Sequence, residues 1–227
     1  MMKLRSYYDN LQPNRNPVGS RYFPSIKRYP QDASLVDFEY VGYLENVQDC
    51  VTLWARTIAA PRRDIAVKFV DRYGKAAHEL LANEGLAPKL LYCGSPGFGD
   101  DEPSYRTITM VVMEYVEGRT FFKMMKDEDV HEDEKDRVGK EVRRALELLH
   151  SGGFVFGDLR SPNIMVTKNG DVKLIDFNWA GIDAQAKYPA VIANVPGMWP
   201  AGVEALAVMK REHDDEMWER LFDPTEA

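Results

Sequence analysis

The spacing of Asp158, Asn163 and Asp176 is the feature of this sequence that most directly predicts chemistry. Asn163 follows Asp158 by five residues, and the pair Asp176-Phe177 begins thirteen residues after Asn163. Phosphoryl transfer needs one carboxylate that orients or receives the attacking hydroxyl, together with an amide and a second carboxylate that hold Mg²⁺ against nucleotide phosphates. These residue types, in this order, therefore predict a phosphoryl-transfer site.

A loop followed by a short hairpin would bring these side chains to one point. Residues 164–166 and 172–175 are mostly apolar and are expected to form two strands. Asn169-Gly170 lies between them, and this dipeptide is typical of a tight turn. The hairpin would return the second carboxylate to the loop that carries the first.

Four segments in a fixed order resemble motifs of the protein-kinase-like superfamily. Asp-Leu-Arg-Ser-Pro-Asn at 158–163 resembles its catalytic loop, and Asp-Phe-Asn at 176–178 resembles its metal-binding motif. Ile-Ala-Val-Lys at 65–68 resembles the strand whose Lys contacts the nucleotide phosphates. Residues 110–118 resemble the strand and hinge that hold adenine. The resemblance covers roughly residues 36–181.

The resemblance implies an α+β, bilobal protein-kinase-like fold. An N-lobe built on an antiparallel sheet would occupy residues 36–117 up to the hinge, and a reduced, mainly helical C-lobe would occupy residues 118–227. Residues 1–35 would form a basic N-terminal arm, since residues 1–30 carry a net charge of +5 and four prolines. Proline disfavours a helix there. We expect an extension packed on the N-lobe, with a docking arm for an acidic partner or a nucleic acid as the alternative.

The resemblance also implies roles for five side chains. Asp158 would orient or deprotonate the acceptor hydroxyl, while Asn163 and Asp176 would bind Mg²⁺. Lys68 would hold the α- and β-phosphates of ATP. Arg160 would offset charge on the γ-phosphate, with a planar fork of donors where protein kinases often carry Lys. ATP and Mg²⁺ are therefore the expected cofactors.

Further contacts are implied on the nucleotide side of the site. In kinases a helix Glu pairs with the strand Lys, and Glu79 is the preferred candidate here, with Glu84 as the alternative. Met113 would line the back of the adenine pocket. The Glu114 carbonyl and the Val116 N–H would bind the adenine edge through the backbone.

The sequence departs from the kinase pattern at several positions. Residues 45–49 contain no glycine, where protein kinases carry a glycine-rich loop that closes over the phosphates. Phe156 and Gly157 replace the His and Arg that usually precede the catalytic Asp, and we expect the Phe156 ring to pack on the metal-binding loop. No Ser or Thr lies between residues 168 and 224, so we expect no activation of this segment by Ser/Thr phosphorylation; Tyr188 is its one hydroxyl.

Related branches of the superfamily share some of these departures. A glycine before the catalytic Asp occurs in aminoglycoside phosphotransferases, choline kinases and small atypical kinases, which the chain also resembles. Only 46 residues follow Gly181. This short end resembles compact kinase-like proteins of basidiomycete fungi.

Local patterns predict the supporting elements. Three strands are expected at 36–44, 50–58 and 65–70, which are rich in β-branched and aromatic residues. A helix is expected over residues 74–84, with Gly85 as its C-terminal glycine.

Three helices are expected in the C-terminal half. The first has apolar residues at helical spacing, namely Val138, Val142, Ala145, Leu146 and Leu149. The acidic run at 127–136 precedes it, where the helix dipole favours negative charge. The other two are expected near 203–209 and around 213–221.

The composition excludes several classes of protein. The 227 residues are 44% hydrophobic and 11% aromatic, as in globular chains. The net charge is −7, and since residues 1–30 carry +5 the remainder carries −12, which argues against a nucleic-acid binder. No apolar run reaches membrane-spanning length, and Cys50 and Cys93 have no metal-ligand spacing. We expect no membrane partner and a cytoplasmic location, with the nucleus as the alternative.

Three functions remain open from the sequence. The first is an ATP- and Mg-dependent phosphotransferase that transfers the γ-phosphate to a hydroxyl acceptor, preferably a protein Ser/Thr. The second is a pseudokinase or nucleotide-binding interaction module, which the missing glycine loop favours. The third is a small-molecule kinase of the aminoglycoside phosphotransferase type, for which the short C-terminal segment leaves little chain. The expected partners are ATP and a protein or small-molecule hydroxyl acceptor.

Overall fold

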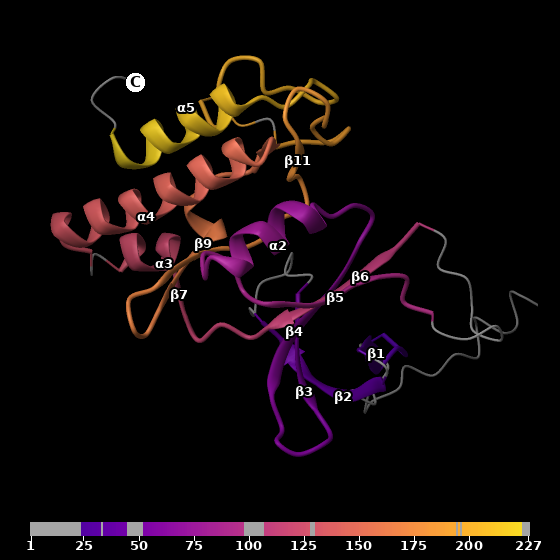
Figure 1. Cartoon of the computed structure of the whole chain (residues 1–227). Helices are drawn as coiled ribbons and strands as arrows, with labels where there is room; N and C mark the ends of the chain where they lie inside the picture. Colours follow the sequence, from indigo (N-terminus) through magenta and orange to yellow (C-terminus); the bar gives the residue numbers. More distant parts are fainter. Residues whose placement is uncertain are drawn as a thin grey trace, which may run out of the picture.

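The computed structural model of this chain describes residues 24–32, 34–44, 52–97, 107–127, 130–193, 195 and 197–223. Antiparallel strands form one end of the molecule, and helices gather at the other (Figure 1). Mixed α/β content with an antiparallel sheet is therefore confirmed. Among the described residues, the structure contains no helix with the length and apolar character needed to cross a membrane.

The larger sheet has six strands in the order β1-β2-β3-β4-β6-β5, and every neighbouring pair is antiparallel. Its strands are β1 (Arg28–Gln31), β2 (Ser34–Tyr43), β3 (Leu53–Thr57), β4 (Asp64–Val70), β5 (Leu90–Gly94) and β6 (Thr109–Glu114). The strands predicted at 36–44, 50–58 and 65–70 correspond to β2, β3 and β4, although residues 50 and 51 lie outside the described residues.

Strand β4 determines on which face of the sheet the predicted lysine lies. Successive side chains of a strand point to opposite faces. Ile65 and Val67 join one apolar cluster, whereas Ala66 belongs to a second cluster, against which Tyr73 packs. Lys68 follows Ala66 by two residues, so it lies on the second face.

Helix α2 (Lys75–Asn83) follows β4 and confirms the helix predicted over residues 74–84. Its buried side chains are Ala77, His78 and Leu81, which lie within one stripe of the helix. The helix ends at Glu84, and Gly85 follows with a left-handed φ of 74°.

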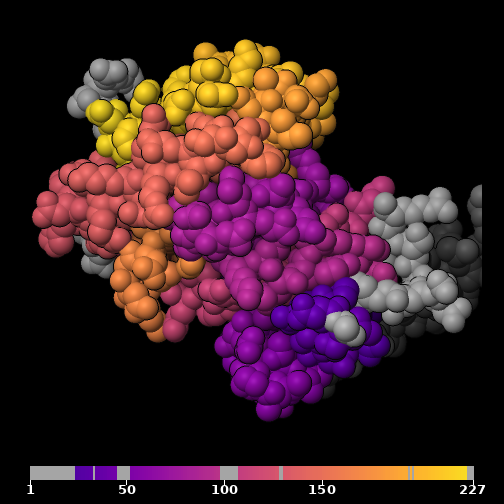
Figure 2. All heavy atoms as spheres, in the orientation of Figure 1, coloured from indigo at the N-terminus to yellow at the C-terminus, as the bar shows by residue number. Residues whose placement is uncertain are grey.

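The other elements build the helical end. They are α3 (Phe121–Lys126), α4 (Glu132–Ser151), α5 (Arg211–Phe222), the 3₁₀ turn η2 (Ser161–Asn163), and the short strands β7 (Gly118–Thr120), β8 (Phe154–Val155), β9 (Ile164–Thr167), β10 (Val172–Leu174) and β11 (Gly181–Ile182). Helix α5 lies along α4, and in both views β1 to β3 lie at the opposite end from α5, with α2 between (Figures 1 and 2).

The predictions of the long helix and of the hairpin are both confirmed. The five apolar residues predicted to share one face of the long helix are all buried in α4. Strands β9 and β10 pair as the predicted hairpin, with Gly170 at φ 87° in its turn. A third strand, β7, adds to β9 and was not predicted.

The helix predicted near 203–209 is wrong. Those residues form turns, and Val208 makes an isolated bridge with Lys187. Gly202 and Leu206 have φ values of 83° and 64°, and this left-handed backbone is incompatible with an α-helix. The last predicted helix, around 213–221, lies within α5, whereas α3 was not predicted.

The predicted N-terminal arm overlaps the sheet. Strand β1 and the first residues of β2 fall within residues 1–35, and Arg28 forms an ion pair with Asp37 at 3.2 Å. The sheet therefore begins at residue 28 rather than 36. Residues 1–23 lie outside the described residues, so the arm stays a prediction.

Candidate active site

Asp158 lies between β8 and η2, and two neighbouring side chains fix its carboxylate. Arg160 donates from Nε to Oδ1 at 2.6 Å and from Nη2 to Oδ2 at 2.9 Å. Asn163 donates from Nδ2 to the Asp158 carbonyl oxygen and to its Oδ2, both at 2.9 Å. Since the amide nitrogen of Asn163 is engaged, its amide oxygen is the atom suited to a cation.

Lys68 and Asp176 are 108 positions apart in the chain, yet Lys68 Nζ lies 2.9 Å from Asp176 Oδ1. Lys68 comes from β4 and Asp176 follows β10. The φ of Asp176 is 66°, a left-handed value that costs a non-glycine residue about 1–2 kcal/mol. Such strain persists where surrounding contacts hold it and is common at functional sites.

Burial shifts the pKa values of Lys68 and of Asp158. It lowers the pKa of Lys68, and the nearby Asp176 carboxylate opposes the shift. Burial also raises the pKa of Asp158, and the Arg160 guanidinium opposes that shift. Strongly perturbed groups with specific charged partners are typical of active sites.

Asp214 binds the backbone of the two residues that precede Asp158. The sequence offers no reason to select it. Asp214 lies on α5 with 0% exposure and accepts hydrogen bonds from the backbone N–H of Phe156 at 2.8 Å and of Gly157 at 2.7 Å. Its Oδ2 also lies 3.2 Å from His150 Nε2. Other acidic residues flank Asp214 in the sequence, and only its burial in the folded chain distinguishes it from them.

The two residues before Asp158 have distinct structural roles. The Phe156 ring packs edge-on to Phe177 with centroids 5.3 Å apart, which confirms the predicted packing on the metal-binding loop. Gly157 has a φ of 78°, and a Cβ there would lie 2.6 Å from Met209 Sδ. A larger residue at 157 would therefore be both strained and too close.

The predicted pairing of Lys68 with Glu79 is not formed in the structure. Glu79 instead lies 3.8 Å from Lys75 in an exposed ion pair. The alternative, Glu84, lies 3.7 Å from Arg144.

The phase of α2 explains this correction. Ala77, His78 and Leu81 form its buried stripe, and one residue advances a helix by about 100°. Glu79 is therefore turned away from the stripe. His78 occupies the inward position next to the metal-binding loop, where its ring stacks on Phe177 with centroids 4.5 Å apart.

The predicted adenine-binding residues lie at the end of β6. Met113 is buried, and Glu114 pairs with Ile65 of β4. The Glu114 backbone N–H donates to the Lys89 carbonyl at 2.9 Å. Val116 lies in the connection to β7. Their contacts with adenine stay predictions.

A family model described as the protein kinase domain matches residues 102–194. These residues contain Asp158, Arg160, Asn163 and Asp176. The serine/threonine-protein kinase STE20 of Kluyveromyces lactis is 31% identical over 115 residues, which cover 51% of this chain and 12% of that protein. The family model and these relatives support a protein-kinase-like superfamily for this chain.

Other relatives of this kinase-like chain match in the same way. The serine/threonine-protein kinase PksC of Streptomyces coelicolor is 39% identical over 85 residues, covering 35% of this chain and 15% of that protein. The serine/threonine-protein kinase PAK mbt of Drosophila melanogaster is 31% identical over 134 residues, covering 56% and 20%. The chain thus spans a fifth or less of the length of these relatives.

In this kinase-like chain, Arg72 fastens the segment that follows Asp176. Its guanidinium donates to three backbone carbonyls: to Asn178 at 2.9 Å, Lys187 at 2.5 Å and Trp179 at 3.1 Å. Arg72 comes from the loop after β4, so the contact joins the sheet to the segment. The sequence offered no signal for it, because all three acceptors are backbone atoms.

Tyr188, the one hydroxyl of this segment, is 1% exposed. Its OH lies 3.0 Å from His213 Nδ1, and burial raises its pKa. A modifying enzyme could not reach this hydroxyl without local unfolding. The expectation that the segment is not switched by phosphorylation is consistent with this burial.

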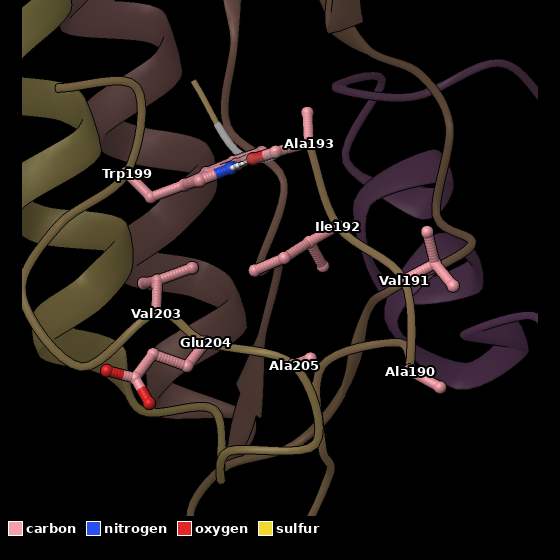
Figure 3. Close-up of a pocket in the computed structure, with 8 residues that line it drawn as sticks. All are labelled: Ala190, Val191, Ile192, Ala193, Trp199, Val203, Glu204 and Ala205. Atoms are coloured by element: carbon pink, nitrogen blue, oxygen red, sulfur yellow. Dashed lines mark hydrogen bonds between the residues drawn. The ribbon is translucent and has the colours of Figure 1, made fainter. Parts of the chain in front are cut away.

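A pocket of about 370 Å³ lies beside Trp199 (Figure 3). It is lined by Ala190, Val191, Ile192, Ala193, Trp199, Val203, Glu204 and Ala205. Trp199 Nε1 donates to the Ala193 carbonyl at 2.8 Å, and the Ile192 side chain extends toward Val203 (Figure 3). The Arg160 guanidinium lies 5.4 Å from the Trp199 ring centroid, so Trp199 connects the pocket to the Asp158 loop.

Proposed function

We propose that this chain is an ATP- and Mg-dependent phosphotransferase that transfers the γ-phosphate to the hydroxyl of a protein Ser or Thr. The observation that carries the proposal is the contact of Lys68 with Asp176 beside the fixed group of Asp158, Arg160 and Asn163. The charge of Asp176 acts on Asp158, which supports a single site.

The proposal includes a two-lobed arrangement. Residues 36–117 would form the nucleotide-side lobe and residues 118–227 the acceptor-side lobe, with β1 extending the first lobe to residue 28. Separate apolar clusters support this division, because two belong to the six-stranded sheet and a larger one belongs mainly to the helical end. ATP would lie between the lobes.

The residues present fit a bound Mg²⁺ ion. Mg²⁺ prefers oxygen ligands and commonly takes one or two from the protein, with phosphates and water completing the shell. The Asp176 carboxylate and the Asn163 amide oxygen supply such a pair. Among the described residues no cluster of three or more His, Cys, Asp or Glu side chains forms a closed metal cage. When bound, the ion would neutralise charge on the β- and γ-phosphates.

Each of these protein groups would have a separate role in the transfer. Asp158 would orient the acceptor hydroxyl and receive its proton, and the positive charge of its Arg160 partner would offset charge on the γ-phosphate. Lys68 would hold the α- and β-phosphates. At the hinge, the Glu114 carbonyl and the Val116 N–H would bind adenine.

A protein acceptor is favoured over a small molecule by two observations. The relatives are named serine/threonine-protein kinases. The mainly apolar pocket beside Trp199 gives a peptide side chain a place next to the Asp158 loop.

Transfer of labelled γ-phosphate from Mg·ATP tests the proposal. Wild type, Asp158→Asn and the control Asp171→Asn, which changes an exposed hairpin-turn residue, are incubated with a generic basic protein. We expect transfer to Ser or Thr by wild type and the control, and a loss of at least about a hundred-fold in Asp158→Asn. Equal transfer by all three would refute the assigned role. Nucleotide binding without transfer by wild type would instead indicate a nucleotide-binding module.

A further inference from the structure

The Lys68 ammonium has an aromatic partner as well as an acidic one. Its Nζ lies 4.9 Å from the centroid of the Tyr73 ring and 2.9 Å from Asp176 Oδ1. Lys68 is 2% exposed. A buried ammonium needs compensating contacts, and the face of an aromatic ring within about 6 Å supplies one.

His78 fixes the position of that ring. The Tyr73 hydroxyl lies 2.7 Å from His78 Nδ1, and His78 Nε2 lies 2.7 Å from the Pro88 carbonyl oxygen. A carbonyl can only accept, so Nε2 carries the proton and Nδ1 accepts from the tyrosine. Burial lowers the pKa of His78 to about 4, so the imidazole is neutral at neutral pH.

The same two rings contact the metal-binding loop. His78 stacks on Phe177 with an interplanar angle of 3°, and the Tyr73 ring lies 6.4 Å from Phe177. Phe177 directly follows Asp176. Both partners of Lys68, the ring and the carboxylate, are therefore held by one packed aromatic cluster.

Helix α2 brings no carboxylate to this point. The ion pair of Lys68 is with Asp176, which follows β10, and not with a residue of α2. Glu79, the helix residue predicted to do so, is about half exposed and pairs with Lys75.

We propose that Tyr73, oriented by His78, holds the Lys68 ammonium in position for the nucleotide phosphates, in place of a helix carboxylate. The inference rests on the proposed function, since it concerns the lysine of the same site. Tyr73 is a positioning residue, because it acts through Lys68 and not on the phosphates themselves.

Nucleotide affinity measures this role directly. The dissociation constant of a fluorescent ATP analogue with Mg²⁺ is compared for wild type, Tyr73→Leu, Tyr73→Phe and Glu79→Gln. We expect Tyr73→Leu to weaken binding between about two-fold and thirty-fold, the range of a cation–π contact. Tyr73→Phe, which keeps the ring, should recover most of the affinity, and Glu79→Gln should leave it unchanged. Weaker binding by Glu79→Gln than by Tyr73→Leu would overturn the proposal.

A double-mutant cycle with Lys68→Met separates positioning from general packing. If Tyr73 acts through Lys68, Tyr73→Leu weakens nucleotide binding no further once Lys68 is Met. A structural role would instead weaken binding equally in both backgrounds. Equal losses would therefore refute the positioning role.

The contact can also be tested without nucleotide. The same cycle is measured by urea unfolding, because the Lys68–Tyr73 contact exists in the free protein. We expect coupling between Lys68 and Tyr73 and none between Lys68 and Glu79. If wild type binds no nucleotide, the proposed function fails, while absence of unfolding coupling at Tyr73 would refute the inference itself.

Discussion

Arg160 and Asp158 constrain each other at the centre of the site. Both guanidinium contacts go to the one carboxylate, and the guanidinium also lies against Trp199. Pairing of this kind favours the ionised form of a buried carboxylate and opposes the effect of burial. Arg160 therefore affects the proton affinity of the group that is proposed to receive the acceptor proton.

Replacing Arg160 by Met should shift the pH dependence of transfer. Burial raises the pKa of Asp158 and Arg160 opposes that rise, so removing the guanidinium raises this pKa further. Asp158 must be ionised to act, and the acid limb of the kcat/KM profile should therefore move to higher pH. Initial rates across the acid range measure it. Arg144→Met, an exposed surface change, is the control, and an unshifted limb in Arg160→Met would contradict the pairing.

Residue spacing could predict which groups converge but not every partner. Asp158 and Asn163 are close in sequence, and the predicted hairpin brings Asp176 back toward them. Glu79 was placed incorrectly because its role depended on the phase of a short helix, which one residue changes by about 100°. Tyr73 and His78 gave no signal, since an aromatic partner for a lysine has no fixed spacing.

At the scale of elements, α5 stabilises the backbone that leads into the Asp158 loop. The Asp214 carboxylate is the acceptor for two consecutive backbone N–H groups of that loop. Buried N–H groups that lose their acceptor each cost about 1–3 kcal/mol. The loop conformation therefore depends on one side chain from a helix more than fifty residues later.

Asp214→Ala should lower the free energy of unfolding by about 2–5 kcal/mol, since two N–H groups would be left unpaired in the interior. Urea unfolding measures this. The neighbouring Asp215→Ala removes a partly exposed ion pair with Arg143 and should cost less than about 1 kcal/mol. Similar losses of unfolding free energy in both variants would show that the hydrogen bonds of Asp214 contribute no more than an exposed ion pair.

Long, regular elements were predictable, and short or interrupted ones were not. Helix α4 has twenty residues with a consistent apolar stripe, and the β9–β10 hairpin has a strong turn. Strand β7 and helix α3 have three and six residues, too few for periodicity to distinguish. The false helix near 203–209 contained helix-forming residues, but left-handed backbone at Leu206 excluded it.

At the scale of the whole molecule, polar contacts around the Asp176–Asn178 segment join the sheet end to the helical end, in addition to the apolar packing of α2 on α4. Lys68 reaches Asp176, and the Gly74 N–H donates to the Phe177 carbonyl at 2.9 Å. A Cβ at residue 74 would lie 2.5 Å from the Ala180 carbonyl oxygen, so the close approach requires glycine. Arg72 adds its three contacts on the same side.

Replacing Arg72 by Met should loosen the segment from 178 to 187 more than it destabilises the protein. The carbonyls it binds can turn to water, so we expect a loss of only about 1 kcal/mol. Limited proteolysis should cut this segment faster than in wild type. Arg62→Met, which removes an exposed ion pair with Glu39, is the control. Unchanged cleavage in Arg72→Met would mean that the segment is held by packing alone.

The burial of Tyr188 against His213 has a consequence for how such a protein could respond to a cell. Phosphorylation of a hydroxyl needs a side chain that another enzyme can reach, and residues 168–223 offer no reachable hydroxyl. If the proposed activity is correct, its rate would not change through phosphorylation of this segment. As far as this segment is concerned, product formation would follow the amounts of protein, nucleotide and acceptor.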